Sequence, residues 1–459
     1  EFLAIENETV EDVRAMKRKY AEIEQDELRR RLVAMANVHT AERFGLDVPG
    51  GAYERMAKAL EDDEEWNSVK DTDWFTSAQA TAGEQDFFHW KLAFPEVFYR
   101  EGGTMRKDAG FDAVIGNPPY VGTRLLTNSQ KEYLNTVYES ATGKWDLYCL
   151  FTERGMSISS RKLSYIQPVM FLRRDYGRGL RQYILDTGHV SEIVDLSLFN
   201  IFDGATNYVC VFTLDTKGGE DSFPVRVPSS VELISSEQSL ERYKIQREDL
   251  SSDAWPVIPP HVKQILDDIP DDFPRLGEIT EYLSEGIKTG LNDVFVIDDK
   301  KRDELNIEKE LLQGFLKGKD IKRYTEPQTS LHCIYPYEDN RLIPESQMKA
   351  KFPNTWEYLN SYKNKLKNRP SVGPKKKEWF ELEREREQEL YYSPKILSPD
   401  ISYHNNFTID YEGVYFNTKV KGIRLYDSLA YKYEGILGIL NSSLLEFIYR
   451  GIAPMKRGD

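Results

Sequence analysis

The residues best suited to chemistry are Asn117, Pro118, Pro119 and Tyr120, which directly follow a short apolar run, FDAVIG, at 111–116. Such runs are typical of buried strands, and ligands in open α/β sheets bind beyond the carboxyl ends of strands. The side-chain oxygen of Asn117 and the carbonyl oxygen of Pro118 are two acceptors on a loop that the prolines stiffen. This loop is therefore suited to holding a group that carries two N–H hydrogens.

An amine attached to a nucleic-acid base is such a group. It is a poor nucleophile because its lone pair is delocalised into the ring, and two acceptors aimed at its hydrogens stabilise the charge that develops when it reacts. A base inside a duplex must first be flipped out and stacked on aromatic side chains, and Tyr120 offers a ring face for this. The loop therefore predicts methylation of an exocyclic amine. The alternative interpretation is an ordinary Pro-Pro turn.

Short apolar runs alternate with helical patterns around this loop. After the strand at 111–116, the sequence predicts strands at 163–169, 192–199 and 208–214, and helices at 131–138, 146–158 and 176–188. Alternating strands and helices indicate an α/β layer with a mostly parallel sheet.

Four segments are expected along the chain. Residues 1–109 form a helical lead-in that begins with a long amphipathic helix at 8–37, and 110–215 form a catalytic half-domain. Scattered Pro, Ser and Asp residues predict a linker at 216–275. Short aromatic-rich strands mixed with helices predict an α+β domain at 276–459.

Composition excludes several protein classes. The 459 residues have a mean hydropathy of −0.58, and no apolar run approaches the roughly 18–20 residues that a membrane helix needs. The three cysteines form no C-x-x-C pair, so neither a zinc site nor a disulfide framework is expected, and a reducing cytoplasm is the simplest setting. No metal site is predicted. The N-terminus has no signal peptide, and its lack of an initiator Met suggests that the chain begins inside a longer protein.

The net charge of −15 is unevenly distributed, because residues 1–110 carry −9 of it. Duplex DNA responds to a local basic face rather than to the average charge of a protein. Two basic groups are candidates for phosphate contacts, with a solvated charge run as the alternative. They comprise Lys317, Lys319, Lys322 and Arg323 in the first group, and Lys363, Lys365, Lys367, Arg369, Lys375, Lys376 and Lys377 in the second.

Together these motifs resemble the γ-class adenine-N6 DNA methyltransferases, especially those fused into type IIG restriction–modification enzymes. The resemblance runs from about residue 85 to the end. It rests on WKLAFPEVF (90–98), GFDAVIGNPPYV (110–121), WDLYCLFTERG (145–155), LSYIQPVMFLRRDYGRGLRQYIL (163–185) and IFDGATNYVCVFTL (201–214). The segments GIKTGLNDVFVI (286–297), FLKGKDIKRY (315–324), PKILSPDIS (394–402) and LGILNSSLLEF (437–447) look like pieces of a TaqI-like target-recognition domain.

The resemblance implies a fold and a reaction. The fold is the C-terminal half of a Rossmann-like methyltransferase sheet, preceded by helices and followed by an α+β target-recognition domain. The reaction is transfer of a methyl group from S-adenosylmethionine to a flipped-out adenine in double-stranded DNA. Phe202 is expected to stack on the face of the base opposite Tyr120, and Asn117, Asp146 and Tyr148 are expected to contact the cofactor.

One element of the family pattern is absent from the sequence. The family binds its cofactor at a Gly-containing turn after a strand upstream of the target loop, and FGLDVPGG (44–51) follows no predicted strand. The cofactor half is therefore expected to lie before Glu1, and the chain alone is expected to be inactive. An incomplete sheet is also expected to expose an apolar edge that favours self-association or a gap-filling partner. No nuclease motif is found.

Two other functions stay open at this point. Loops of the NPPY type also occur in methyltransferases that act on RNA or on a protein glutamine, although the long region after 276 argues against these. The chain is also consistent with a DNA-binding specificity module that has no catalytic role.

Overall fold

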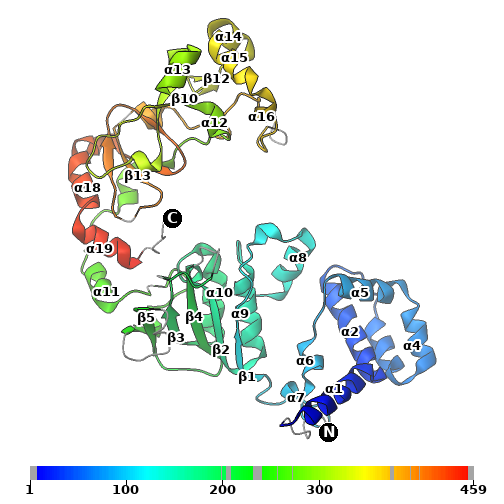
Figure 1. Ribbon diagram of the computed structural model, residues 1–459. Coiled ribbons are helices and arrows are strands. Elements are labelled where there is room, and N and C mark those ends of the chain that lie inside the picture. The colour runs from blue at the N-terminus through cyan, green and yellow to red at the C-terminus, as the bar shows by residue number, and fades with distance from the viewer. Residues whose placement is uncertain are drawn as a thin grey trace. The chain divides into compact units, whose positions relative to one another are not determined.

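The computed structural model describes residues 8–197, 199–202, 208–230, 240–255, 257–270, 272–372, 377–392, 394–402 and 404–452. The chain divides into two compact units, Glu1–Pro260 and His261–Asp459 (Figure 1). In the part of the chain that the structure describes, no helix is long and apolar enough to cross a membrane.

The first unit begins with helices. They are α1 (Val10–Gln25), α2 (Glu27–Arg43), α3 (Ala52–Lys58), α4 (Asp63–Lys70), α5 (Asp73–Glu84), α6 (Trp90–Ala93) and α7 (Pro95–Phe98). The single helix expected at 8–37 is broken at Asp26, whose backbone is not helical and whose carboxylate caps α2 by accepting from the Arg29 amide at 2.8 Å. Helices α2 to α5 enclose a small core that includes Val38, Met56 and Trp66.

A six-stranded sheet follows, in the order β1-β2-β4-β3-β5-β6. The strands are β1 (Phe111–Gly116), β2 (Ser159–Pro168), β3 (His189–Asp195), β4 (Val209–Asp215), β5 (Ser222–Pro228) and β6 (Leu240–Gln246), and the helices among them are α8 (Asn128–Val137), α9 (Leu147–Ile158) and α10 (Arg178–Thr187). All four predicted strands and all three predicted helices of 111–214 are present. Helix α9 packs on β1 and β2.

The sheet is mixed, so the expectation of a mostly parallel sheet is wrong. The pairs β1–β2 and β3–β5 are parallel, whereas β2–β4, β4–β3 and β5–β6 are antiparallel. A parallel neighbour needs a long crossover, usually a helix. The segment between Asp195 and Val209 contains no helix among its described residues, and β4 returns beside β3 in the opposite direction.

The linker expected at 216–275 is also corrected by the structure. Strands β5 and β6 lie within this range and extend the sheet, and the boundary between the two units falls after Pro260. Phe223 and Val225 are buried on alternate positions of β5, and Trp255 is buried in the same core. Apolar residues alternate with other residues in this segment, which is the pattern of a strand. The prolines and charged residues of the segment obscured this pattern.

The second unit is α+β, as expected. One sheet has the order β15-β9-β10-β8, another has the order β14-β13-β16-β7, and β11 pairs with β12. The strands are β7 (Thr280–Glu285), β8 (Val296–Asp298), β9 (Leu312–Leu316), β10 (Leu331–Ile334), β11 (Tyr337–Glu338), β12 (Arg341–Leu342), β13 (Lys395–Pro399), β14 (Thr408–Asp410), β15 (Tyr415–Phe416) and β16 (Val420–Leu425). The helices include α11 (Pro260–Asp267), which begins at the boundary, α12 (Asn292–Phe295), α13 (Asp299–Leu305), α14 (Glu345–Lys351), α15 (Pro353–Ser361), α16 (Lys363–Lys367), α17 (Glu389–Tyr392), α18 (Tyr433–Leu440) and α19 (Ser443–Ile452).

Candidate active site and nucleic-acid interface

The target loop begins where β1 ends. Gly116 is the last residue of β1 and pairs in register with Tyr165 of β2. A side chain could not replace the glycine without movement, since a β-carbon at position 116 would lie 3.2 Å from the Tyr165 ring. Asn117 follows on the exposed side of this contact, and Pro118 is buried. The close approach of β1 to Tyr165 therefore fixes the point at which the loop leaves the sheet.

The two acceptors of the loop differ in exposure, because Asn117 is exposed and Pro118 is buried. Among the described residues, no hydrogen bond engages the Asn117 side chain or the Pro118 carbonyl oxygen. The prolines that follow restrict the backbone at Asn117 and Pro118, which limits the conformations that this part of the loop can adopt. This arrangement fits the predicted role of Asn117 and Pro118 as acceptors for an amine.

Tyr120 anchors the other end of the loop. Its hydroxyl donates to the Ile166 carbonyl oxygen of β2 at 2.9 Å, and burial raises the pKa of Tyr120 to about 12. The phenol therefore stays protonated at neutral pH and keeps its role as a donor. Its ring packs edge to face against Tyr148, with the ring centroids 6.1 Å apart.

The structure brings Phe202 to Tyr120, as the resemblance implied. The two ring centroids lie 6.3 Å apart, but the planes meet at 66°. A base between two rings needs parallel planes separated by about two contacts of about 3.5 Å each. As they stand, the two rings pack against each other and leave no room for a base between them, and Tyr120 is held by its hydrogen bond to Ile166.

Besides Asn117, two residues are expected at the cofactor, Asp146 and Tyr148, and they differ in their surroundings. Tyr148 is 1% exposed, packs in the core of the sheet, and shares a hydrogen bond of 3.0 Å with the Tyr176 hydroxyl. Its side chain packs in the core, and its expected contact with the cofactor stays a prediction. Asp146 stands directly before α9, where the Leu147 amide donates to the Val121 carbonyl oxygen at 2.9 Å.

The Asp146 carboxylate is poised for a donor. Its Oδ1 atom is shielded from solvent and makes no hydrogen bond with the described residues, and burial raises the pKa of this carboxyl. A buried acceptor without a partner is costly, and a bound hydroxyl or amine would satisfy it. Asp146 therefore fits a polar group of a small molecule bound beside the target loop.

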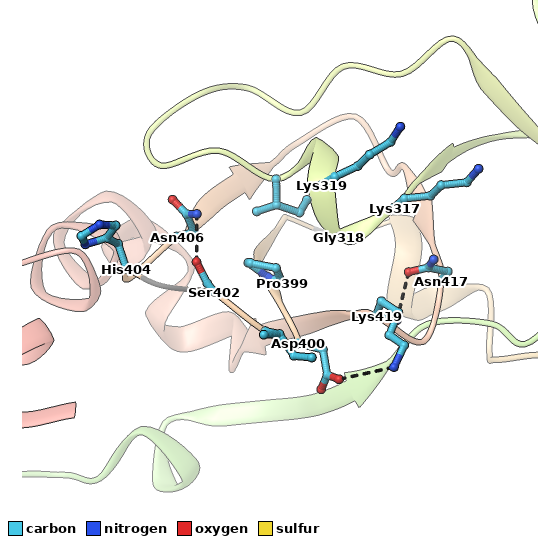
Figure 2. Close-up of a pocket in the computed structure, with 12 residues that line it drawn as sticks. Lys317, Gly318, Lys319, Pro399, Asp400, Ser402, His404, Asn406, Asn417 and Lys419 are labelled. Atoms are coloured by element: carbon cyan, nitrogen blue, oxygen red, sulfur yellow. Dashed lines mark hydrogen bonds and ion pairs between the residues drawn. The ribbon is translucent and has the colours of Figure 1, made fainter. Parts of the chain in front are cut away.

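In the second unit, Lys317 and Lys319 of the first basic group line a cleft of about 640 Å³ (Figure 2). Lys317 and Lys319 extend from the turn after β9, and Lys419 comes from the turn before β16. Lys322, in the same segment, is exposed. Within the described part of the chain, the ammonium groups of Lys317, Lys319 and Lys322 form no ion pair.

Three basic residues of the prediction have structural roles instead. Arg369 is 6% exposed and donates to the carbonyl oxygens of Thr289, Leu366, Trp379 and Glu381 at 2.8–3.0 Å. Lys377 forms ion pairs with Glu381 and Glu385 at 2.9 and 2.8 Å. Arg323 donates to the carbonyl oxygen of Asn441 at the end of α18. Arg369 and Lys377 in particular are removed from the candidate DNA contacts by this geometry.

The remaining basic residues stay predictions. Helix α16 carries Lys363, Lys365 and Lys367, of which Lys365 and Lys367 are exposed and Lys363 lies 4.9 Å from the centre of the Trp379 ring. Lys375 and Lys376 lie outside the described residues.

Sequence reasoning missed the polar residues that share the cleft with the lysines. They are Ser402, His404, Asn406 and Asn417, together with Asp400 and Lys419. Asp400 and Ser402 lie in the segment 394–402 that resembles a target-recognition domain, but none of the six belongs to a charge run that would have singled it out. They meet because β13 pairs with β16 and β15 pairs with β9, which brings the ends of these strands together. Pairing between strands so far apart in sequence cannot be seen in the sequence itself.

No group of three or more His, Cys, Asp or Glu residues that could hold an ion occurs in the described ranges. Cys149, Cys210 and Cys333 are all buried, and burial raises the pKa of each thiol.

Two family descriptions match the chain. Residues 26–202 match the Eco57I restriction-modification methylases, and residues 313–459 match the TaqI-like C-terminal specificity domain. The chain is 25% identical over 389 residues to the type II restriction enzyme and methyltransferase RM.Eco57I of Escherichia coli, which covers 76% of the chain and 38% of the relative. It is also 25% identical over 374 residues to the type II methyltransferase M.BstVI of Geobacillus stearothermophilus, which covers 76% of the chain and 64% of the relative. The chain thus spans less than two thirds of either protein.

Among solved structures, the chain is similar to the type IIL restriction-modification enzyme MmeI in complex with DNA. The TM-score is 0.53 at 14% sequence identity, over 76% of this chain and 45% of that one. This similarity shows a shared fold.

Proposed function

Because the chain joins an Eco57I restriction-modification methylase domain to a TaqI-like C-terminal specificity domain, we propose that it supplies the target-amine and DNA-recognition parts of a site-specific adenine-N6 DNA methyltransferase. The observation that carries this proposal is the loop after β1, where the Asn117 and Pro118 oxygens form no hydrogen bond among the described residues and Tyr120 of the same loop packs against Phe202. We place the enzyme among restriction–modification methyltransferases of the type IIG kind.

The chain's own residues perform the part of the reaction at the acceptor nitrogen. The oxygens of Asn117 and Pro118 accept hydrogen bonds from the two N–H groups of the amine. These bonds reduce the delocalisation of the nitrogen lone pair into the ring. As the new N–C bond forms, the nitrogen becomes positively charged, and the two oxygens stabilise that charge until one proton leaves. Tyr120 and Phe202 hold the flipped base. S-adenosylmethionine supplies the methyl group when bound, and Asp146 is the residue here that fits one of its polar groups.

Identification of the methylated product tests the proposal. DNA from cells that express the full-length gene product is digested to nucleosides and analysed by mass spectrometry. We expect N6-methyladenine that disappears when Asn117 is replaced by alanine. Methylation confined to RNA or to a protein glutamine, with no modified nucleoside in DNA, would contradict the proposal.

The first prediction concerns the aromatic pair. Replacing Tyr120 or Phe202 by alanine is expected to weaken capture of an extruded adenine by about 1–3 kcal/mol each, the usual contribution of a ring stacked on a base. A fluorescent base analogue at the target position reports flipping. The control is Tyr120→Phe, which keeps the ring and loses the hydrogen bond to Ile166. An analogue signal that neither alanine variant changes would mean that the two rings do not hold the base.

The second prediction concerns the 459-residue chain by itself. Donor and acceptor must be held together, and such orientation contributes roughly 7–11 kcal/mol to a reaction. The described residues before β1 are helical and contain no strand followed by a glycine turn. We therefore expect this chain to bind S-adenosylmethionine weakly or not at all and to leave DNA unmethylated.

Calorimetry with S-adenosylmethionine measures this directly, and a micromolar dissociation constant would contradict it. The same preparation is expected to self-associate in sedimentation velocity runs. Strand β1 is an edge of the sheet, and Ile115 on it is 81% exposed, which leaves an apolar edge able to pair with another strand.

A further inference from the structure

The cleft of Figure 2 is built from three loops of the second unit. They are the turn after β9 that contains Lys317 and Lys319, the 399–406 loop after β13, and the turn before β16 that contains Asn417 and Lys419. Lys317 and Lys319 extend from their turn in the same general direction in Figure 2. The cleft therefore combines cationic side chains from two loops with polar side chains from a third.

The charge of the cleft favours an anion. Lys317 and Lys319 form no ion pair among the described residues, and Lys419 lies 4.0 Å from Asp400 with its side chain 66% exposed. Asp400 also pairs with Lys421 at 3.3 Å, so this one carboxylate is shared by two lysines. The surplus of positive charge is what a phosphate backbone requires.

Asn405 and Phe407, at the far end of the 399–406 loop, are held by hydrogen bonds to the end of α18. The buried Asn405 side chain donates to the Leu440 carbonyl oxygen at 2.8 Å, and the fully buried Asn441 side chain bonds both the amide and the carbonyl of Phe407 at 3.0 and 2.9 Å. Arg323 in turn donates to the Asn441 backbone. A loop fixed in this way loses little conformational entropy when it binds a partner.

Asn406 projects from this fixed end toward the cleft. Its side-chain nitrogen donates to the Ser402 hydroxyl at 3.0 Å, and the described residues make no other hydrogen bond with the carboxamide. The side-chain oxygen and one N–H therefore remain free, which is the acceptor and donor pair that an asparagine uses on the N6 and N7 edge of adenine. The hydrogen bond to Ser402 is itself exposed, so the free groups of the carboxamide can be reached from solvent.

We propose that this cleft is a DNA-reading surface, in which Lys317, Lys319 and Lys419 contact phosphates and Asn406 contacts a base edge. The inference rests on the proposed function, because it names residues through which the DNA substrate is recognised. It assigns positioning to the lysines and sequence choice to the 399–406 loop, the division of labour that phosphate and base contacts have in DNA complexes.

Salt dependence tests the lysines. Binding of the full chain to duplex DNA is measured by fluorescence anisotropy at several salt concentrations, for the wild type and for Lys317→Ala, Lys319→Ala and Lys419→Ala. Each variant is expected to reduce the slope of log affinity against log salt by up to about 0.9. The control is Lys300→Ala, which removes an 82% exposed lysine of α13. Helix α13 follows β8, and β8 and β15 are the two opposite edges of their sheet. Slopes that match the control would overturn the assignment of the lysines.

Selection of binding sites from a random duplex pool tests Asn406. Wild type is expected to enrich a sequence motif, and Asn406→Ala is expected to lose preference at one position while its salt slope stays unchanged. A motif that survives Asn406→Ala intact, or a wild type that enriches no motif, would overturn the reading role. If the wild type binds no DNA at all, the proposed function itself fails, whereas DNA binding that ignores the cleft variants refutes only this inference.

Discussion

Replacing Asn117 by alanine is expected to lower the rate of methyl transfer by about 100-fold or more, measured by single-turnover methylation with labelled cofactor in the full-length gene product. The variant removes one of two preorganised hydrogen-bonding groups that stabilise the charged nitrogen, and the loss of one such group elsewhere has this magnitude. DNA affinity is expected to change little, because Asn117 belongs to the target loop and not to the basic cleft.

Two further variants separate the chemistry from the fold. Asn117→Asp keeps a side-chain acceptor oxygen and is expected to retain more activity than Asn117→Ala. Asn128→Ala makes the same chemical change at an exposed position of α8 and is expected to act like the wild type. Wild-type rates in Asn117→Ala, or equal losses in the Asn117 and Asn128 variants, would show that the amine is not held by this loop.

The strands and helices of 111–214 could be predicted because their signals are local. The apolar run at 111–116 became β1 with the same bounds, since a short apolar segment that ends in prolines leaves little choice of structure. Order and direction within the sheet are not local properties. Strand β4 lies between β2 and β3 and runs antiparallel to both, and its own residues do not predict this position.

The basic residues show the same limit more sharply. Charge density could be counted along the sequence, and it correctly drew attention to Lys317 and Lys319 beside the cleft. It could not distinguish them from Arg369, whose guanidinium reaches back to the Thr289 carbonyl oxygen across 80 positions of sequence. Whether a cation meets solvent or a buried carbonyl depends on contacts between distant segments, and the residue type carries no information about them.

The aromatic pair of the target site lies between these cases. Tyr120 could be assigned from its own motif, whereas Phe202 was assigned by resemblance, and the structure places their rings 6.3 Å apart. Their edge-to-face angle was not predictable, because it depends on how the Tyr120 hydroxyl reaches Ile166 on β2. The position of the loop thus follows from local signals, and the angle between the two rings follows from contacts with the sheet.

A buried ion pair in the second unit leads to the last prediction. Lys395 on β13 and Asp410 on β14 face each other in register and form an ion pair, with side chains 0% and 1% exposed. Lys395 also donates to the Tyr391 carbonyl oxygen at 2.8 Å, and Asp410 accepts from the amides of Glu412 and Val414 at 3.0 and 2.9 Å. The pair therefore fixes the turn that leads from β14 to β15.

Lys395→Met is expected to lower the free energy of unfolding of this unit by about 3–5 kcal/mol, because it leaves the Asp410 carboxylate buried without its counter-charge. Hydrogen exchange of the β13 and β14 peptides at increasing urea concentrations measures this loss within the second unit. The double variant Lys395→Met with Asp410→Asn removes both charges and keeps an acceptor for the turn, so it is expected to recover much of the lost stability.

The matched control is Lys300→Met, an 82% exposed lysine whose replacement is expected to change stability by less than about 0.5 kcal/mol. If Lys395→Met is no less stable than this control, the ion pair does not stabilise the unit. If the double variant is as unstable as Lys395→Met alone, the loss comes from the shape of the lysine side chain rather than from the uncompensated charge. A large loss in the single variant, recovered in the double variant, leaves the buried charge of Asp410 as its cause.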